Sequence, residues 1–234
     1  MRPRAPAVTA VIAAAGSGER LGASGPKAFV PLAGRPMIEW SIDAFRACDS
    51  VRSIVVAVPP GHVHDLAGHD LGVVSGGATR AQSVANAMAA VGTGLVAIHD
   101  AARPLVTPEL VEALVACLDE APEAAGVIAA TPVTDTIKRV APPSSSSRVV
   151  VETLDRAQLW AAQTPQVFRT EALRAALASS PNPEQATDEA MLVEEAGGTV
   201  LIHPTGTENF KVTTPLDLRV AELLVAERSA SAGA

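Results

Sequence analysis

The sequence predicts an open α/β fold, in which helices cover both faces of a mixed, mainly parallel sheet. Short apolar segments rich in β-branched residues alternate with longer segments whose apolar residues recur at helical spacing. The short segments are apolar throughout, as is typical of strands that are buried on both faces of a parallel sheet. With 234 residues, 48% of them hydrophobic, the chain can bury one large core. We therefore expect a single domain over residues 1–234.

The first part of the chain is expected to hold five strands and three helices in alternation. The strands are predicted at 9–15, 53–59, 72–77, 95–100 and 126–133, and the helices between them at 37–48, 79–91 and 107–120. Thr107 is the expected N-cap of the last helix, because Pro108 follows it at the first helical position. This order of elements supports a doubly covered sheet.

The pattern changes in residues 135–168, where two β-like runs flank the segment APPSSSS. That Pro- and Ser-rich tip cannot continue a strand and is too polar for the core. We therefore expect a long hairpin here, with residues 137–159 projecting from the domain as an arm. Because an isolated hairpin is marginal in water, a second copy of the chain is the expected partner, and the protein is expected to be a homodimer.

The last third is expected to hold a helix, two strands and a closing helix. Thr187 is the expected N-cap of a helix over DEAMLVEEAGG, which ends at Gly197–Gly198. TVLIHP and NFKVTT are predicted strands. Thr214 and Pro215 are expected to open the closing helix as its cap and first residue.

Charge and composition exclude several classes of protein. A net charge of −7 argues against a protein that coats nucleic acid, and 3% aromatic residues without any Tyr argue against base-stacking platforms. Cys48 and Cys117 lack the spacing of a zinc site or a disulfide framework, which favours a reducing compartment. The N-terminus resembles a signal peptide, but Thr9 interrupts its apolar run, which leads directly into a Gly-rich turn. We therefore expect a strand of a cytoplasmic protein with no membrane span.

The Gly-rich turn after the first strand, AVIAAAGSGERLGASGPK, indicates nucleotide binding, because free N–H groups in such a turn can face phosphate oxygens. The Walker A pattern fails, since Lys27 follows Pro26 and precedes Ala28. The dinucleotide fingerprint fails, since Leu21 replaces its third glycine. The turn instead carries two cations, Arg20 and Lys27. These are the groups that would stabilise a triphosphate under attack at its α-phosphate.

Two further strand ends carry candidate ligand groups. IHDAARP ends a strand at the carboxyl edge of the sheet, where open α/β folds bind ligands. Its carboxylate, Asp100, suits Mg²⁺, which takes one or two protein carboxylates and bridges triphosphate oxygens. The pair Gly76–Gly77 ends another strand, and its small size lets backbone groups approach a base edge, with Ser83 on the helix that follows.

Histidines contribute little to this prediction. His62, His64 and His69 lie close in sequence, as metal ligands often do, but they occupy a loop-to-helix stretch without Cys. We expect them to be loop residues, and we expect His99 to be structural.

The opening block, AAAGSGERLGASGPKAFVPLAGRPMIEWS, closely resembles the signature of the 2-C-methyl-D-erythritol 4-phosphate cytidylyltransferases. The similarity continues in the same order through GGATRAQSVANAM, VAIHDAARPLV, PVTDTIKRV, TLDRAQLWAAQTPQVF, ATDEAMLVEEAGG and ENFKVTTPLDL. It spans nearly the whole chain apart from the hairpin tip and the termini. The resemblance implies a Rossmann-like nucleotidyltransferase fold. It also implies the transfer of CMP from CTP to 2-C-methyl-D-erythritol 4-phosphate, with release of pyrophosphate.

The resemblance implies roles for individual residues. Asp100 would bind Mg²⁺, and the catalytic residues would be Arg20, Lys27, Lys211 and Arg156. Substrate would be bound by Ala14, Ala15, Gly16, Gly18, Gly77, Ser83, Asp100, Ala102, Arg103, Thr136 and Thr164. If the arms cross between subunits, Arg156 would complete the site of the neighbouring chain. Ala78 stands where many relatives carry Asp, so the preference for CTP over UTP would depend more on backbone groups.

Two alternative functions stay open. A cytidylyltransferase for another polyol phosphate, such as ribitol 5-phosphate, would share the CTP-side blocks. A non-catalytic nucleotide-binding or scaffold protein could keep the same fold, although the intact Arg20, Lys27, Asp100 and Lys211 argue against it. The sequence has no evident Ser/His/Asp or Cys/His nucleophile, which agrees with direct transfer between phosphates.

Overall fold

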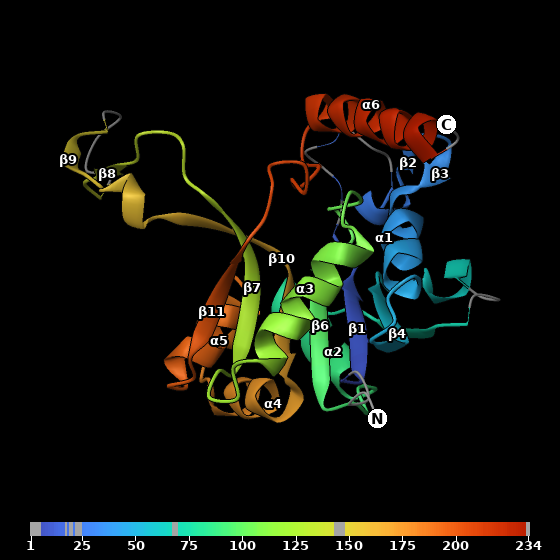
Figure 1. Cartoon of the computed structure of the whole chain (residues 1–234), viewed down its shortest axis with the longest axis horizontal. Coiled ribbons are helices and arrows are strands. Elements are labelled where there is room, and N and C mark those ends of the chain that lie inside the picture. Colours follow the sequence, from blue (N-terminus) through green and yellow to red (C-terminus); the bar gives the residue numbers. More distant parts are fainter. Residues whose placement is uncertain are drawn as a thin grey trace.

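The computed structural model describes residues 6–16, 18, 21, 25–66, 70–142 and 148–232. Its main sheet has seven strands in the order β11-β7-β10-β6-β1-β4-β5 (Figure 1). All of them are parallel except β10, which is antiparallel to both of its neighbours. The strands are β1 (Val8–Ala13), β4 (Val51–Val58), β5 (Gly72–Ser75), β6 (Leu95–Asp100), β7 (Gly126–Pro132), β10 (Trp160–Arg169) and β11 (Val200–Pro204). The predicted mixed, mainly parallel sheet is confirmed.

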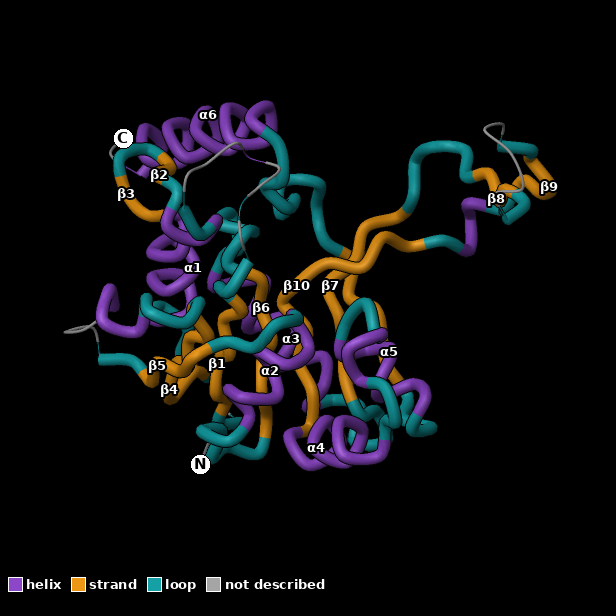
Figure 2. Tube along the Cα trace, turned by 180° about the vertical axis from the view of Figure 1, so that it is seen from behind, coloured by secondary structure: helices purple, strands orange, loops and turns teal. Residues whose placement is uncertain are grey.

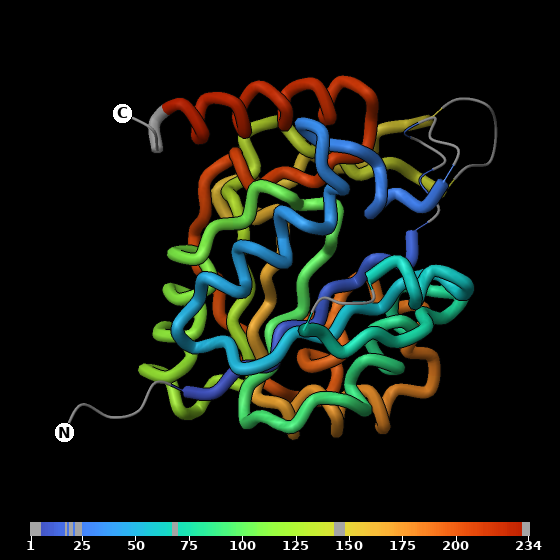
Figure 3. Tube along the Cα trace, turned by 90° about the vertical axis from the view of Figure 1, so that its right-hand side faces the viewer, coloured from blue at the N-terminus to red at the C-terminus, as the bar shows by residue number. Residues whose placement is uncertain are grey.

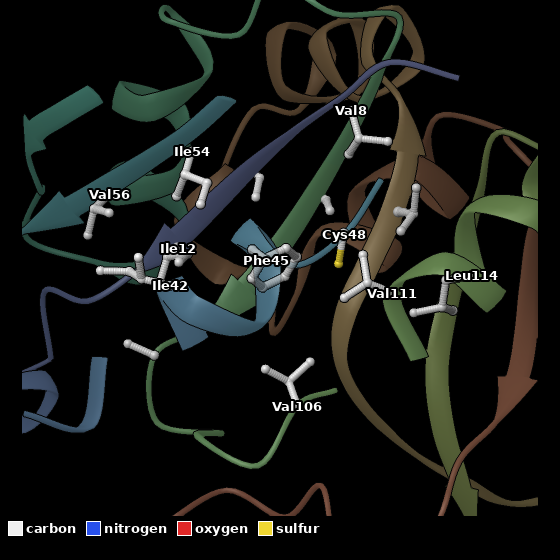
Figure 4. Close-up of a cluster of buried hydrophobic side chains, with 14 of the residues drawn as sticks. Val8, Ile12, Ile42, Phe45, Cys48, Ile54, Val56, Val106, Val111 and Leu114 are labelled. Atoms are coloured by element: carbon white, nitrogen blue, oxygen red, sulfur yellow. The ribbon is translucent and has the colours of Figure 1, made fainter. Parts of the chain in front are cut away.

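Helices cover both faces of this sheet, as predicted. The covering helices are α1 (Met37–Arg46), α2 (Arg80–Met88), α3 (Pro108–Asp119), α4 (Thr170–Ser179) and α5 (Glu189–Glu195), and α6 (Pro215–Ala232) lies apart from them. The side chains of β1 alternate between the faces: Val8 and Ile12 pack with α1 and α3, whereas Val11 packs with α2, α4 and α5. Figure 4 shows the first of these layers, with Ile42 and Phe45 of α1 against the strands. No helix in the described part of the chain is long and apolar enough to span a membrane.

Local capping signals were predicted well, with one exception. Thr107 accepts a hydrogen bond from Leu110 N–H and Pro108 begins α3, as predicted. Thr214 accepts one from Asp217 N–H, and Pro215 begins α6. The prediction that Thr187 caps α5 is wrong, because the neighbouring Asp188 accepts the hydrogen bond from Met191 N–H. A carboxylate at this position also interacts favourably with the positive end of the helix dipole.

The predicted hairpin over 135–168 is too long. Only β8 (Lys138–Val140) and β9 (Val150–Thr153) pair with each other, and Figures 1 and 2 show this small sheet apart from the main one. The rest of the returning run is β10, which enters the main sheet between β6 and β7. Its Val167 and Phe168 are fully buried, one on each face. Tertiary pairing with two strands therefore overrides the local hairpin pattern.

Two further elements differ from the prediction. NFKVTT, residues 209–214, is an irregular segment rather than a strand: Val212 N–H donates to Ala102 O in the loop after β6, and the Asn209 amide donates to Thr164 O in β10. Helix α4 was not predicted, and it fills the turn between β10 and α5.

Helix α6 lies across the end of the sheet where β1 and β6 finish (Figures 1 and 3). Its Ala221 and Val225 pack in a separate apolar cluster with Leu32 of β2 (Pro31–Leu32) and with Leu105. The segment before α6 is thereby held beside the carboxyl ends of the strands. Open α/β sheets bind their ligands at this edge.

Gly126, at the start of β7, provides a test of this packing. A Cβ there would overlap the fully buried ring of Phe168, whose Cε1 would lie 2.7 Å away. We expect Gly126→Ala to lower the free energy of unfolding by about 1–3 kcal/mol, because the ring has no room to move. Urea denaturation measures this change. Gly92→Ala is the matched control, since nothing lies within 4 Å of a Cβ there, and equal stability of the two variants would contradict the packing.

Candidate active site

A cavity of about 430 Å³ lies at the carboxyl ends of β1 and β6. Its wall comes from four parts of the chain: the turn after β1, the Gly pair with the start of α2, the loop after β6, and the segment before α6. The predicted residues that line it are Ala14, Ala15, Gly16, Gly18, Lys27, Gly77, Ser83, Asp100, Ala102 and Lys211. The fold thus gathers most of the predicted site around one cavity.

The turn after β1 is closed at its base by glycine. Gly18 has a φ of +79°, and a Cβ there would lie 2.9 Å from Gly25 O and 3.1 Å from Lys27 N. Lys27 N–H also donates to Gly16 O at 3.0 Å. These contacts place Lys27 at the cavity wall. Arg20 lies outside the described residues, so its catalytic role stays a prediction.

The Gly pair is held against the start of α2 by one hydroxyl group. Gly77 N–H donates to Ser83 Oγ at 3.1 Å, and Ser83 Oγ–H donates to Thr79 O at 2.9 Å. A Cβ on Gly76 would lie 2.6 Å from the Cβ of Ala15, so only glycine lets this loop approach the turn after β1. Ser83 therefore shapes the cavity through its own hydrogen bonds.

Four charged groups are linked in a row that begins at the cavity wall and ends in the protein interior. Asp100 Oδ1 accepts from Arg80 Nε at 2.8 Å, and Asp100 Oδ2 accepts from Lys211 Nζ at 2.6 Å. Arg80 Nη1 also lies 2.7 Å from both oxygens of Glu189. The Asp100 and Glu189 side chains are only 10% and 1% exposed. Two carboxylates and two cations are thus linked without a break.

Arg80 and Glu189 were not predicted as site residues. Arg80 lies in the segment GGATRAQSVANAM and Glu189 in ATDEAMLVEEAGG, two of the segments that resemble the family. However, Arg80 follows a helix cap and Glu189 begins a helix, and local sequence gives either residue a solvent-exposed role. The only signal in the sequence was their presence in those blocks.

The neighbouring charged groups determine the protonation state of Asp100. Burial alone would raise the pKa of Asp100, but Arg80 and Lys211 outweigh it and hold that pKa well below its usual value. Asp100 is therefore an anion at neutral pH. Burial raises the pKa of Glu189, and the Arg80 guanidinium opposes that rise. Two oxygens that both accept from one guanidinium group fit an ionised Glu189.

The backbone of Asp100 is fixed by a buried polar network. Asp100 N–H donates to Thr164 Oγ1 at 3.0 Å, and Thr164 Oγ1 lies 3.1 Å from His99 Nδ1. Burial lowers the pKa of His99 to about 3, so its ring is neutral. The other ring nitrogen, Nε2, faces Arg103 O at 3.2 Å. Because that carbonyl only accepts, Nε2 carries the proton and Nδ1 accepts from Thr164.

Several predicted residues do not line the cavity. The Thr164 hydroxyl is engaged in the network above. Arg103 Nη1 donates to Asn209 O at 2.8 Å, while its buried Nε has no hydrogen-bond partner among the described residues. Thr136 lies on the way into the arm, and Arg156, on the way back, donates to Thr134 O. Their predicted roles stay predictions, because one chain does not bring Thr136 and Arg156 to the cavity wall.

The described loop histidines and Cys48 do not contribute to the cavity wall. Within the described ranges, no three His, Cys, Asp or Glu residues group as metal ligands. His62 stacks on Phe29 and lies 2.6 Å from Asp65, while His69 is outside the described residues. Burial raises the pKa of the Cys48 thiol to about 12, so it is not a reactive thiolate.

Comparisons with known proteins agree on one family. The family model described as 2-C-methyl-D-erythritol 4-phosphate cytidylyltransferase matches residues 8–227. A protein of that name from Synechococcus sp. (strain CC9902) is 41% identical over 94% of this chain and 98% of its own length. Another protein of that name, from Frankia casuarinae, is 45% identical over 94% of this chain and 82% of its own length. The crystal structure of the Thermus thermophilus enzyme of that name has a TM-score of 0.77 and 35% identity, covering 93% of this chain and 98% of its own.

The buried, neutral His99 predicts how stability depends on pH. Its pKa is about 3 in the folded chain and 6.5 for the free side chain, so below about pH 6.5 the unfolded state binds the extra proton. We expect this group alone to lower the free energy of unfolding by about 2 kcal/mol between pH 6.5 and 4.5. His99→Asn should lack that contribution, so the stability gap between wild type and variant should narrow as pH falls.

Denaturant unfolding across this pH range measures the effect. His64→Asn, at an exposed position, is the control for removing an imidazole, and it should follow the wild-type curve. A constant gap between His99→Asn and wild type would show that His99 is not held neutral.

Proposed function

The chain belongs to the 2-C-methyl-D-erythritol 4-phosphate cytidylyltransferase family, and from this premise we propose how its cavity works. The enzyme transfers CMP from CTP to 2-C-methyl-D-erythritol 4-phosphate. The products are 4-diphosphocytidyl-2-C-methyl-D-erythritol and pyrophosphate. This reaction supplies a precursor in isoprenoid biosynthesis by the non-mevalonate route.

The convergence of cations on a glycine-lined cavity is the observation that carries the proposal. Lys27, Arg80 and Lys211 come from three segments of the chain and all line one cavity. A triphosphate carries several negatively charged groups and can contact cations from separate segments at once, and the glycine turn lets backbone groups approach phosphate oxygens. The volume of about 430 Å³ is within the usual range for a small-molecule site.

The chemistry that this arrangement supports is direct transfer. A phosphate oxygen of the acceptor attacks the α-phosphorus of CTP in line. The bond from that phosphorus to the oxygen bridging to the β-phosphate breaks, and pyrophosphate leaves. The nucleophile is already anionic at neutral pH, so the protein needs only to position it and to stabilise charge. Lys27 and Lys211 would stabilise the charge, while Arg103, whose Nε lacks a partner among the described residues, and Thr136 would hold the acceptor.

A divalent cation fits this site through Asp100. Mg²⁺ commonly takes one or two carboxylates and completes its shell with phosphate oxygens and water. Asp100 offers one ionised carboxylate at the cavity wall, so most other ligands would come from the triphosphate and from water. Bound there, Mg²⁺ would polarise phosphate oxygens and offset negative charge.

We also propose that residues 1–234 form one nucleotidyltransferase domain and that residues 137–159 form its dimerisation arm. Val149, Val150 and Val151 are 62%, 53% and 58% exposed in one chain. Three consecutive exposed valines on a projecting segment favour burial against another protein surface. A second copy of the chain, with its own arm, would cover them and would bring Arg156 to the cavity of the other chain.

The two cysteines support a reducing location. Cys48 and Cys117 are both free thiols, which favours the cytoplasm over an oxidising compartment.

A panel of acceptors tests the proposed function. The purified chain, CTP and Mg²⁺ are combined with 2-C-methyl-D-erythritol 4-phosphate or ribitol 5-phosphate, and pyrophosphate release is followed. We expect kcat/KM for the first acceptor to exceed that for the second by about a hundredfold or more. A preference for ribitol 5-phosphate would reassign the acceptor. Tight CTP binding without pyrophosphate from either acceptor would indicate a non-catalytic protein.

Removing the Lys27 ammonium group should damage catalysis and spare the fold. We expect Lys27→Ala to lower kcat by about a hundredfold or more, because the charge that develops on the phosphates loses a nearby cation. Steady-state pyrophosphate release measures this, and circular dichroism checks folding. Arg46→Ala removes an exposed cation on α1 and should leave kcat unchanged. Near-normal turnover of folded Lys27→Ala would remove Lys27 from the mechanism.

A charge on the arm should separate the subunits. We expect Val150→Lys to shift the protein from dimer to monomer in analytical ultracentrifugation, and to lower kcat/KM because Arg156 would no longer reach the other chain. Leu223→Lys is the control, since Leu223 on α6 is 66% exposed and lies outside the arm. If Val150→Lys stayed dimeric, the interface would lie elsewhere.

A further inference from the structure

Glu189 is a buried carboxylate that does not itself reach the cavity. Its side chain is 1% exposed, it lies in the first turn of α5, and it is not among the cavity-lining residues. Both of its oxygens accept from Arg80 Nη1 at 2.7 Å. Burying a charge so completely is costly unless it is paired, and a hydrophobic pair of similar volume is often as stable. The fold alone therefore does not account for this pair.

Arg80 connects Glu189 to the site. Its side chain is 27% exposed and lines the cavity, and its Nε donates to Asp100 Oδ1 at 2.8 Å. The guanidinium group thus divides its charge between a carboxylate behind it and a carboxylate at the cavity. Without Glu189, the full positive charge of Arg80 would act on Asp100, which already receives Lys211 at 2.6 Å.

This division of charge matters for a cation more than for an anion. Asp100 has to attract a divalent cation while Arg80 and Lys211 lie against it. A negative charge on Glu189 lowers the positive potential at Asp100, which favours the divalent cation and slightly disfavours the free triphosphate. Two other charged groups lie close to these four ionised side chains: Arg103, which acts on Arg80, and Asp188, which acts on Glu189. They carry opposite signs, so they do not replace the effect of Glu189.

We propose that Glu189 is a positioning and charge-balancing residue for the site. Through Arg80, it keeps the Asp100 carboxylate oriented and open to the divalent cation that accompanies the nucleotide. The inference rests on the proposed function, since it takes CTP with a divalent cation as the ligand.

The test measures binding of CTP without an acceptor, so that no turnover takes place. Titration calorimetry gives the dissociation constant of CTP in EDTA and that of CTP with Mn²⁺, and their ratio is the gain from the metal. Glu189→Gln keeps the size of the side chain. We expect it to bind metal-free CTP about threefold more tightly, and we expect the ratio of its two dissociation constants, the metal gain, to be about tenfold smaller than in wild type. Glu195→Gln, at an exposed position on the same helix, should match wild type in both.

The opposite signs of the two effects distinguish this role from a structural one. A folded Glu189→Gln that binds both forms of CTP more weakly, or that matches Glu195→Gln, would overturn the inference. The double variant Arg80→Gln/Glu189→Gln removes one charge of each sign, so its metal gain should lie within about threefold of wild type.

If Glu189→Gln did not fold, Arg80→Gln would carry the test with the signs reversed: a larger metal gain and weaker metal-free CTP. Unchanged or smaller metal gain in that variant would overturn the inference, and so would failure of both single variants to fold. Pyrophosphate release by wild type with 2-C-methyl-D-erythritol 4-phosphate is measured in parallel. If that reaction fails, the proposed function fails, independently of how Glu189 behaves.

Discussion

The ion-paired carboxylate of Asp100 is the constraint on which the rest of the site depends. It stands at the end of β6, a strand buried along its whole length, and receives Arg80 from α2 on one side and Lys211 from the segment before α6 on the other. These partners are distant in sequence, so the pairs can form only when the sheet and its covering helices are assembled. In return, each pair fixes a cation at the cavity. The positions of these two cations at the cavity therefore depend on the folded sheet.

The backbone of Asp100 is as tightly held as its side chain. The neutral ring of His99 orients the Thr164 hydroxyl, which receives Asp100 N–H. Thr164 belongs to β10, the antiparallel strand of the sheet. Several buried polar groups of this strand have hydrogen-bond partners, since the Asn209 amide donates to Gln163 Oε1 and to Thr164 O. Strand β10 therefore holds the backbone of Asp100 in place, although no β10 residue lines the cavity.

The arm carries a small two-stranded sheet that is separate from the main sheet. Its pair of strands lies away from the main sheet (Figure 2), and its valines stay largely exposed within one chain. Arg156 lies at the base of the same arm. A surface that favours association and a cation expected to bind substrate are thus close together in sequence. If the proposed dimer forms through the arm, the oligomeric state would decide whether Arg156 reaches the site of the other chain.

The sequence by itself determined the features that depend on neighbouring residues. These are the alternation of strands and helices, the Thr107 and Thr214 caps, the glycine turn that carries Lys27, and the position of Asp100 at a strand end. Periodicity and turn chemistry act over a few residues, so they can be read along the chain. Only the tertiary structure decided the place of β10, the irregular path of 209–214 and the pairing of Arg80 with Glu189. Those outcomes depend on which distant groups meet, and the energy of a buried charge or an unpaired backbone group is set by that meeting rather than by local pattern.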